Sequence, residues 1–363
     1  MIPITSTDRL MILAPHPDDE SLATGGLIQR ARAVGAKVRV IMATNGDNNP
    51  WPQRIIERRI FVSHHDRARW GARRRRETRH ALQKLGAESG DALFLNLPDQ
   101  GITDLLLRGS DNVLAALRMA YEVERPTILV IPSADDSHPD HSALHVFARM
   151  ALDALPAGSV RVLEFIVHRS RAHAPLEKIA LHLQPGEQAT KREAILCHET
   201  QVKLSHRRFT AYARPEEPYQ IPAEPAEDSD VHPIRRAWLD RFALRLTIAP
   251  YARPQKGRTL SIALESCTGG HVRWSLDLLT RSGWGHLRDE ITGAILRRAT
   301  VRVQGGVAEV CIPIAGLRPI THAFVKLTRR KFFYDSWGWR AVPVQAAAGR
   351  NETLLAVAKS HRP

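Results

Sequence analysis

The chain has 363 residues, 43% of them hydrophobic and 25% charged, which is an ordinary balance for a globular protein. This length exceeds what one hydrophobic core usually supports, so two domains are expected. The first ten residues lack the pattern of a signal peptide, no apolar run reaches the roughly 18 residues of a membrane span, and the three cysteines are too scattered for a disulfide framework. Together these features predict a cytoplasmic protein.

The formal net charge of +14 comes mainly from arginine and predicts an electric field that attracts acidic partners. Candidate partners are acidic substrates, such as nucleotide sugars and glycolipids, and an anionic surface such as the inner face of a membrane, which the protein would contact peripherally. No helix-turn-helix, zinc-finger or RNP-type pattern accompanies the charge, so no nucleic-acid partner is expected. Solvated arginine-rich faces are the alternative explanation of this composition. The oligomeric state is left open.

Short apolar runs alternate with amphipathic patterns over the first two hundred residues. The runs predicted to be strands are Met11–Ala14, Val38–Ala43, Leu93–Leu97, Ile128–Ile131 and Val160–Val167. The stretches predicted to be helices are Ser21–Val34, Arg74–Leu85, Asp111–Glu124 and Ala143–Leu155. Strands that alternate with helices form parallel sheets covered on both faces, so an α/β domain is predicted, with functional loops at the carboxyl ends of its strands.

A change of composition divides the chain. Five prolines interleave with acidic residues between Arg214 and Pro233, which is typical of an extended linker. Beyond it, alternation with a period of two and the pair Gly305-Gly306 predict a small all-β, sandwich-like domain with a hairpin at the glycines. We therefore expect an α/β domain over residues 1–212, a linker over 213–235, a β domain over 236–345 and a frayed tail over 346–363.

Two clusters of histidine and carboxylate residues each follow a predicted strand. Residues 14–20, APHPDDE, come directly after the first strand, and residues 136–141, DSHPDH, follow the strand Ile128–Ile131. If these strands are parallel neighbours, both clusters lie at the same edge of the sheet. Histidine and carboxylate are usual donors of a catalytic zinc site, in which three protein ligands leave one position for water. The spacing leaves open which side chains bind metal, and for one cluster alone helix capping is an alternative.

These clusters carry a resemblance to a known family. Residues 14–26, APHPDDESLATGG, closely resemble the first motif of the PIG-L/LmbE-like de-N-acetylases, and HPDH at 138–141, with Asp136 before it, is similar to the second. Weaker similarities to further family motifs lie at 74–86, 95–101 and 191–201. The resemblance implies a Rossmann-like fold and a zinc-dependent hydrolase that removes the N-acetyl group from an amino sugar of the GlcNAc type.

Matched position by position, the resemblance implies metal ligands, catalytic residues and substrate contacts. It assigns one Zn²⁺, or another divalent transition metal, to His16, Asp19 and His141. It makes Asp18 the general base, His138 the residue that stabilises the oxyanion or protonates the leaving amine, and Asp140 the residue that orients His138. The implied substrate contacts are Arg74, Asp99 and His198, with Gln201 nearby.

A long arginine-rich segment, residues 45–72, distinguishes this chain from smaller members of the family. Nine arginines lie between Arg54 and Arg76, and the segment leaves the carboxyl end of the second strand. We expect it to overhang the catalytic edge and to receive phosphate or another acidic group of the substrate. A solvated basic helix is the alternative, and the pair His64-His65 is expected to lie at the surface.

Two other classes of function fit parts of the sequence. A metal-dependent amidase that acts on a glycosylated secondary metabolite or a thiol conjugate would use the same clusters. A basic sugar- or nucleic-acid-binding protein without catalysis would use the arginines together with Trp51 and Trp70. The complete histidine and carboxylate set of both motifs favours an enzyme.

Overall fold

A computed structural model describes residues 2–109, 111–168, 178–222, 224–250, 258–266, 270–279, 281–329 and 337–344. These residues divide near residue 224 into two compact units. The expected tail, residues 346–363, lies outside the described ranges. None of the helices within these ranges is long and apolar enough to cross a bilayer.

The first unit is built on a seven-stranded sheet with the strand order β3-β2-β1-β4-β5-β7-β6. Its strands are β1 (Arg9–Ala14), β2 (Lys37–Thr44), β3 (Ala92–Leu97), β4 (Ile128–Pro132), β5 (Arg161–Phe165), β6 (Lys178–His182) and β7 (Glu216–Gln220). The strands β1 to β5 are parallel, whereas β7 runs antiparallel to both of its neighbours. The predicted α/β class and all five predicted strands are confirmed.

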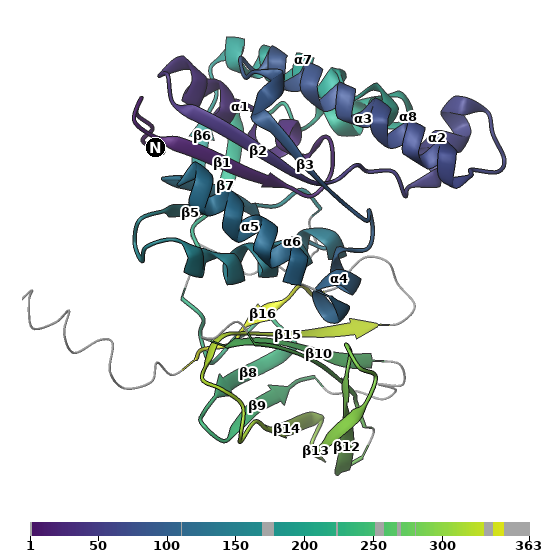
Figure 1. Cartoon of the computed structure of the whole chain (residues 1–363), viewed down its shortest axis with the longest axis vertical. Coiled ribbons are helices and arrows are strands. Elements are labelled where there is room, and N and C mark those ends of the chain that lie inside the picture. The colour runs from purple at the N-terminus through teal and green to yellow at the C-terminus, as the bar shows by residue number, and fades with distance from the viewer. Residues whose placement is uncertain are drawn as a thin grey trace, which may run out of the picture. The chain divides into compact units, whose positions relative to one another are not determined.

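Helices cover both faces of this sheet (Figure 1). One face carries α1 (Asp19–Ala33), α3 (His64–Lys84), α7 (Pro185–Leu196) and α8 (Glu199–Thr210), and the other carries α4 (Ile102–Arg108), α5 (Asp111–Glu124) and α6 (Pro139–Ala151). The short α2 (Pro50–Glu57) and the beginning of α3 extend beyond the sheet. The helix predicted from Arg74 begins ten residues earlier, because Ser63 and Asp66 form a capping box at its start.

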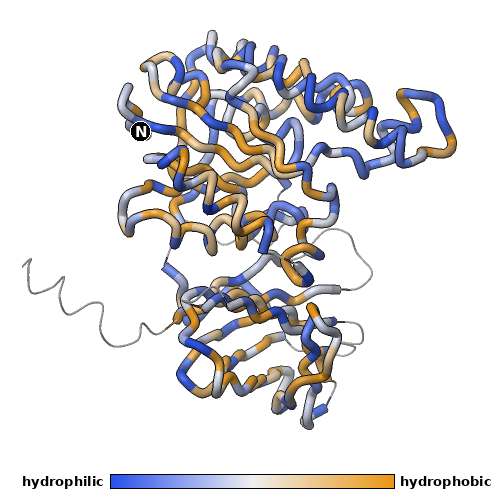
Figure 2. Tube along the Cα trace, in the orientation of Figure 1, coloured by the Kyte–Doolittle hydropathy of each residue, from blue (hydrophilic) through white to orange (hydrophobic). Residues whose placement is uncertain are grey.

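Buried aliphatic side chains fix the centre of the sheet. Leu10, Ile12, Val40, Ile128 and Val130 belong to one cluster and are almost completely buried. Figure 2 shows these strands as predominantly apolar and α3 as predominantly polar. Each such side chain contributes about 1.5–3 kcal/mol when it is buried. This burial fixes the carboxyl ends of β1 and β4, and with them the starting points of the loops that follow.

The strand order brings the ends of β1 and β4 side by side. β1 pairs with β2 on one side and with β4 on the other, where Leu10 lies opposite Ile128. Loops that leave neighbouring strands at such a reversal of strand order diverge and open a crevice. Residues 15–18 lead from β1 into α1, and residues 133–138 lead from β4 into α6. The two sequence clusters therefore meet at this edge.

The strand β7 lies inside the stretch that was expected to be an extended linker. Glu217 and Tyr219 point into the unit and are buried, whereas Pro218 between them is exposed. The Glu217 carboxylate accepts hydrogen bonds from the N–H groups of Gly26 and Leu27 and from Lys191 Nζ. The prolines concealed this alternation, because proline is compatible with a strand where its missing N–H is not needed for pairing. The first unit thus includes residues that the linker prediction excluded.

The second unit is an antiparallel sheet with the strand order β16-β15-β10-β11-β12-β13-β14-β9-β8. Its strands are β8 (Ile234–Leu239), β9 (Ala243–Ile248), β10 (Arg258–Ser266), β11 (His271–Asp277), β12 (Gly283–Asp289), β13 (Ile295–Gln304), β14 (Val307–Pro313), β15 (Ile320–Arg329) and β16 (Arg340–Ala341). Gly305 and Gly306, both at positive φ, connect β13 to β14 in the predicted hairpin. A bridge from Leu239 to Val344 brings the two edges together. The all-β prediction is confirmed, but one sheet curls into a near-barrel around its core.

Candidate metal centre

The loop after β1 presents the side chains of His16, Asp18 and Asp19. The N–H of His16 donates to Asp19 Oδ2 at 2.9 Å, which ties the start of the loop to its end. Asp18 adopts a φ of 124°, a conformation that favours glycine, and its N–H donates to Glu20 Oε2 at 2.9 Å. Strain of this kind persists where the surrounding structure enforces it, commonly at functional sites. Here it separates two consecutive carboxylates, which have different partners.

Asp136 organises the loop after β4. Its Oδ1 accepts a hydrogen bond from the N–H of His138 at 2.9 Å, and its Oδ2 accepts from those of Val167 at 2.8 Å and His168 at 3.0 Å. The same Oδ2 lies 3.1 Å from Nδ1 of His141. Because this carboxylate is completely buried, these contacts fix the loop relative to α6 and to the end of β5.

Three donor atoms from the two loops face one another. His16 Nδ1 lies 3.3 Å from His141 Nε2, His141 Nε2 lies 3.2 Å from Asp19 Oδ2, and Asp19 Oδ2 lies 3.3 Å from His16 Nδ1. A tetrahedral zinc ion with bonds of about 2.0–2.1 Å holds its ligand atoms roughly 3.3–3.4 Å apart. The three atoms are therefore spaced like three corners of such a tetrahedron. We refer to His16, Asp19 and His141 as the tripod.

Carboxylates behind the tripod hold its histidine rings. Nε2 of His16 lies 3.2 Å from Asp140 Oδ2 and 3.3 Å from Asp99 Oδ1, while Nδ1 of His141 faces Asp136. Each ring thus gives one nitrogen to the tripod and the other to a carboxylate, the arrangement that orients histidine ligands in metal sites. The described residues around the tripod also form further groups of histidine and carboxylate atoms within 4.8 Å of one another. This donor set fits a divalent metal.

In the absence of a metal, protonated histidines balance the negative charge of the carboxylates in this cluster. Burial lowers the pKa of His141, but the Asp136 and Asp19 carboxylates raise it to about 9. Burial is likewise outweighed at His16, whose pKa Asp140 and Asp19 raise well above its usual value. The pKa of Asp19 is held well below its usual range, because the two histidines outweigh the effect of its burial. A divalent cation would replace these protons, as metal binding generally does at histidine ligands.

Asp18 is paired with Arg74 of α3. Arg74 Nη2 lies 3.2 Å from Asp18 Oδ2, and the same guanidinium donates to the carbonyl of Pro17 and, at 2.8 Å, to that of Gly46. Burial raises the pKa of Asp18 to about 7, against the opposing effect of Arg74. A carboxylate poised near neutrality suits the work of a general base. Arg74, expected as a substrate contact, is itself buried and contacts the loop after β1.

His138 caps the start of α6. Its Nδ1 accepts a hydrogen bond from the N–H of Asp140 at 3.2 Å, so the proton of the neutral ring lies on Nε2. The Asp140 carboxylate accepts from the N–H groups of Gln100 at 2.7 Å and Ile102 at 3.0 Å, and it contacts His16. Asp140 thus contacts the His138 ring through its backbone N–H, while its carboxylate contacts other residues. In the first turn of α6 the side chain points to the loop after β3 instead.

The other two expected substrate contacts have structural partners. His198 is 1% exposed, and its Nε2 lies 2.9 Å from Glu20 Oε1. Because Glu20 accepts the N–H of Asp18, His198 supports the loop after β1 through Glu20. Asp99 accepts the N–H of Asn48 at 2.6 Å and lies beside the tripod. Among the described residues, these contacts favour a positioning role for His198 and a place at the site for Asp99.

The structure also brings His168 to the site, a residue that the sequence analysis did not select. Its ring centroid lies 5.0 Å from that of His141 and 5.3 Å from that of His138. Burial lowers the pKa of His168 to about 4. The signal that could have found it is its place directly after β5, a third parallel strand whose carboxyl end meets the same edge.

Both loops of the tripod lie within a stretch that matches a family model. Residues 11–152 match PIG-L, described as GlcNAc-PI de-N-acetylase. The amino-terminal unit thus contains a stretch that is similar to the PIG-L family. The resemblance predicted from its two motifs is thereby confirmed, and the tripod comes from both ends of the matched stretch.

Curated proteins that are similar to this chain are named as deacetylases. The 1D-myo-inositol 2-acetamido-2-deoxy-alpha-D-glucopyranoside deacetylase of Mycobacteroides abscessus is 28% identical over 209 residues, which are 52% of this chain and 71% of the relative. The protein of the same name from Rhodococcus jostii is 27% identical over 272 residues, or 68% of this chain and 84% of the relative. Among solved structures, the N,N'-diacetylchitobiose deacetylase of Pyrococcus horikoshii matches with a TM-score of 0.43 and 22% identity, covering 59% of this chain and 84% of its own.

Proposed function

We propose that this protein is a metal-dependent hydrolase that removes the N-acetyl group from an N-acetylated amino sugar. The observation that carries the proposal is the tripod, whose three donor atoms lie 3.2–3.3 Å apart beside a buried carboxylate with a pKa of about 7. The names of the curated relatives, which are amino-sugar deacetylases, support the reaction and the substrate class. Zinc is the metal we expect, because two histidines and one carboxylate are a frequent ligand set of hydrolytic zinc sites.

The tripod residues would hold the metal, and Asp18 would handle the proton of water. When bound, the metal supplies a Lewis acid that polarises the amide carbonyl and makes water a better nucleophile near neutral pH. Asp18 accepts a proton from the water that adds to the carbonyl carbon. Arg74 holds this carboxylate in place and limits the rise of its pKa, so that part of the population is ionised at neutral pH.

His138 would serve the carbonyl oxygen and the leaving amine. Its Nε2 carries the proton of the neutral ring, because its Nδ1 accepts from the backbone of Asp140. This N–H can donate to the oxygen on which negative charge develops as water adds. The C–N bond then breaks, the sugar nitrogen takes up the proton released by water, and acetate leaves.

We further propose that the substrate carries an acidic group. Arg67 of α3 donates to Asn48 Oδ1, and the N–H of Asn48 donates to Asp99 beside the tripod. Arg67 thus lies three contacts from His16 and could receive phosphate or a carboxylate of the substrate with its planar fork. A neutral N-acetyl sugar would give this arginine no such task.

Acetate release from a panel of N-acetylated compounds tests the proposal. The panel comprises N-acetylglucosamine, its 1-phosphate, a nucleotide-linked form, an inositol-linked form and an N-acetylated glycosylated metabolite, each with chelator and with added Zn²⁺. We expect zinc-dependent release from at least one amino sugar. Release from the metabolite alone would favour a different amidase, and sugar binding without any release would indicate a binding protein.

A further inference from the structure

The end of the projection formed by α2 and α3 exposes four large apolar side chains. Trp51, Ile55, Ile60 and Phe61 are 67%, 58%, 79% and 85% exposed, and the last two are the most exposed large hydrophobic side chains of the described residues. Trp51 and Ile55 lie one turn apart on α2, and Ile60 and Phe61 follow in the loop to α3. Figure 2 shows the apolar stretch in this loop. We call these four residues the α2–α3 tip.

Polar contacts within the projection hold it together without using the tip. Gln53 Nε2 donates to the carbonyl of Asp66 at 2.8 Å, Arg59 Nη1 pairs with Asp66 Oδ1 at 2.8 Å, and Arg69 Nη2 pairs with Glu57 Oε2 at 2.7 Å. Both acidic residues of the turn are thus paired internally. Burial of polar groups beneath exposed Trp, Ile and Phe reverses the usual distribution and marks an interaction site.

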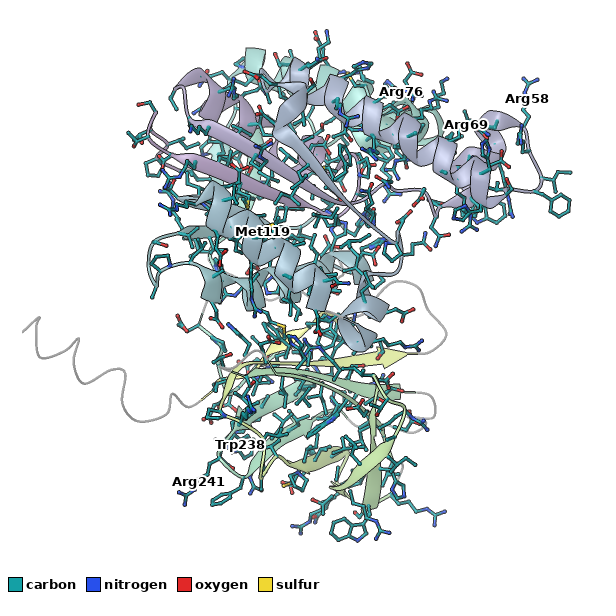
Figure 3. All side chains as sticks on the ribbon, viewed as in Figure 1. Arg58, Arg69, Arg76, Met119, Trp238 and Arg241 are labelled. Carbon is teal, nitrogen blue, oxygen red and sulfur yellow. The ribbon has the colours of Figure 1, made fainter. Side chains whose placement is uncertain are left out.

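Arginines accompany the exposed apolar side chains. The guanidinium of Arg54 lies 5.4 Å from the centre of the Trp51 ring, and Arg58 ends α2 in a left-handed conformation next to Arg59. No ion pair links Arg54 or Arg58 to an acidic side chain among the described residues of the unit. Figure 3 shows Arg58 directed away from the body of the domain at the end of the projection.

We propose that the α2–α3 tip docks on an anionic lipid surface. Apolar and aromatic side chains flanked by arginines are what interfacial membrane-binding segments present, because the apolar part enters the headgroup boundary while the cations contact lipid phosphates. A projecting end needs no shape complementarity to enter a bilayer. A stable protein interface buries about 800 Å² on each partner around a packed centre, and four side chains on a projecting turn form no such centre.

The position of the tip relative to the metal centre gives docking a consequence. The chain leaves β2 at Thr44, passes Asn48 beside Asp99, and reaches α2 two residues later. The projection therefore begins at the edge of the sheet that carries the tripod. Docking concerns where the protein works and is independent of the proposed chemistry, so the two proposals can fail separately.

Vesicle flotation with the full chain tests the proposal directly. The probes are vesicles of phosphatidylcholine alone and of phosphatidylcholine with one quarter phosphatidylglycerol. We expect the wild type to bind the anionic vesicles and to bind the zwitterionic ones much more weakly. The double variant I60S/F61S should lower the partition coefficient at least about tenfold, and R58S about fivefold on anionic vesicles only.

Matched controls separate the tip from general surface properties. M119S/V123S removes two exposed apolar side chains from α5 of the same domain, and R76S removes an exposed arginine further along α3 (Figure 3). M119S/V123S should leave the partition coefficient within about twofold because α5 is not part of the tip. R76S should do so because a charge more than a Debye length of about 10 Å from the lipid surface is screened. W51S/I55S provides a second test of the tip if I60S/F61S misfolds.

Three results would overturn the proposal. One is the absence of binding of the wild type to anionic vesicles. Another is an equal loss of binding in the tip variants and in the controls. The third is a wild-type dimer in vesicle-free buffer that I60S/F61S dissociates, which would make the tip an interface between two copies. Acetate release from a soluble substrate should be the same in I60S/F61S and in the wild type.

Discussion

Charged side chains in the metal centre lie buried against partners, whereas apolar side chains at the α2–α3 tip lie exposed. Asp136 is completely buried and has contacts on both oxygens, while Phe61 is 85% exposed. Burial of a charge is costly unless its partners are in place, so the metal centre must be rigid to exist at all. Exposure of a phenyl ring is costly in water and is relieved by a partner. Both regions depart from the usual distribution of polar side chains outside and apolar side chains inside. We relate the buried charges to the proposed metal and the exposed apolar side chains to the proposed lipid surface.

The largest expected effect comes from removing a tripod histidine. In H16A or H141A the metal loses one of its three protein ligands, so both variants should lose bound metal and at least about a thousandfold of acetate release. Metal content per chain and initial rates check this. H182A, which removes an exposed histidine of the same domain, serves as the control and should keep both properties. Retention of metal by H141A would show that the tripod is not the ligand set.

A buried pair that is purely structural should respond in stability and not in metal content. K191M leaves Glu217 buried without its ammonium partner, which lies at 2.5 Å in the wild type, and should lower the free energy of unfolding by about 3 kcal/mol. Denaturant unfolding measures this value. K84M removes a half-exposed lysine of α3 and should change it by less than about 0.5 kcal/mol. Equal effects in both variants would mean that the buried pair contributes nothing specific.

Sequence and structure agree most closely where the signal is local. The meeting of residues 16–19 with residues 138–141 could be predicted, because each group lies in the loop after a strand of the same parallel sheet. The structural role of Glu217 could not be predicted, because its carboxylate accepts a hydrogen bond from Gly26 in a helix almost two hundred residues away. The prolines around Glu217 suggested a linker instead. The contact of His198 with Glu20 could not be predicted for the same reason, because the two residues lie far apart in sequence.

The tip shows a different kind of failure. From the sequence, Trp51 could only be described as an aromatic residue near arginines, and Ile60 and Phe61 carried no signal. Exposure is decided by what the rest of the fold leaves uncovered, which no local pattern reports. The arginines were predicted as one group, yet the structure divides them into Arg59, which pairs with Asp66, and Arg58, which has no acidic partner among the described residues.

Substitutions of the two consecutive aspartates should have different effects, one on turnover and the other on metal binding. D18N keeps the tripod and should retain metal while turnover falls about a hundredfold, because the general base is lost. D19N removes a tripod oxygen and should empty the site. Metal analysis of the two proteins beside their turnover numbers makes the comparison. The reverse pattern, with D18N empty and D19N full, would exchange the two assigned roles.

The smallest effect is expected for the arginine near the site. R67Q should raise KM for an acidic N-acetyl sugar about fivefold and leave KM for neutral N-acetylglucosamine unchanged, because only the former carries an anionic group. R58Q, which changes an arginine beside the α2–α3 tip, should leave both values unchanged. Steady-state kinetics at two ionic strengths measures this, since the contribution of Arg67 should weaken as salt rises. Equal changes of KM on both substrates in R67Q would assign Arg67 to the fold.

Metal content measured together with activity tests the tripod most directly. The full chain should hold one divalent metal per molecule after exhaustive dialysis. A strong chelator should remove the metal and acetate release together, and one equivalent of Zn²⁺ should restore both. Undiminished acetate release from chelator-treated protein that contains no metal would contradict the account.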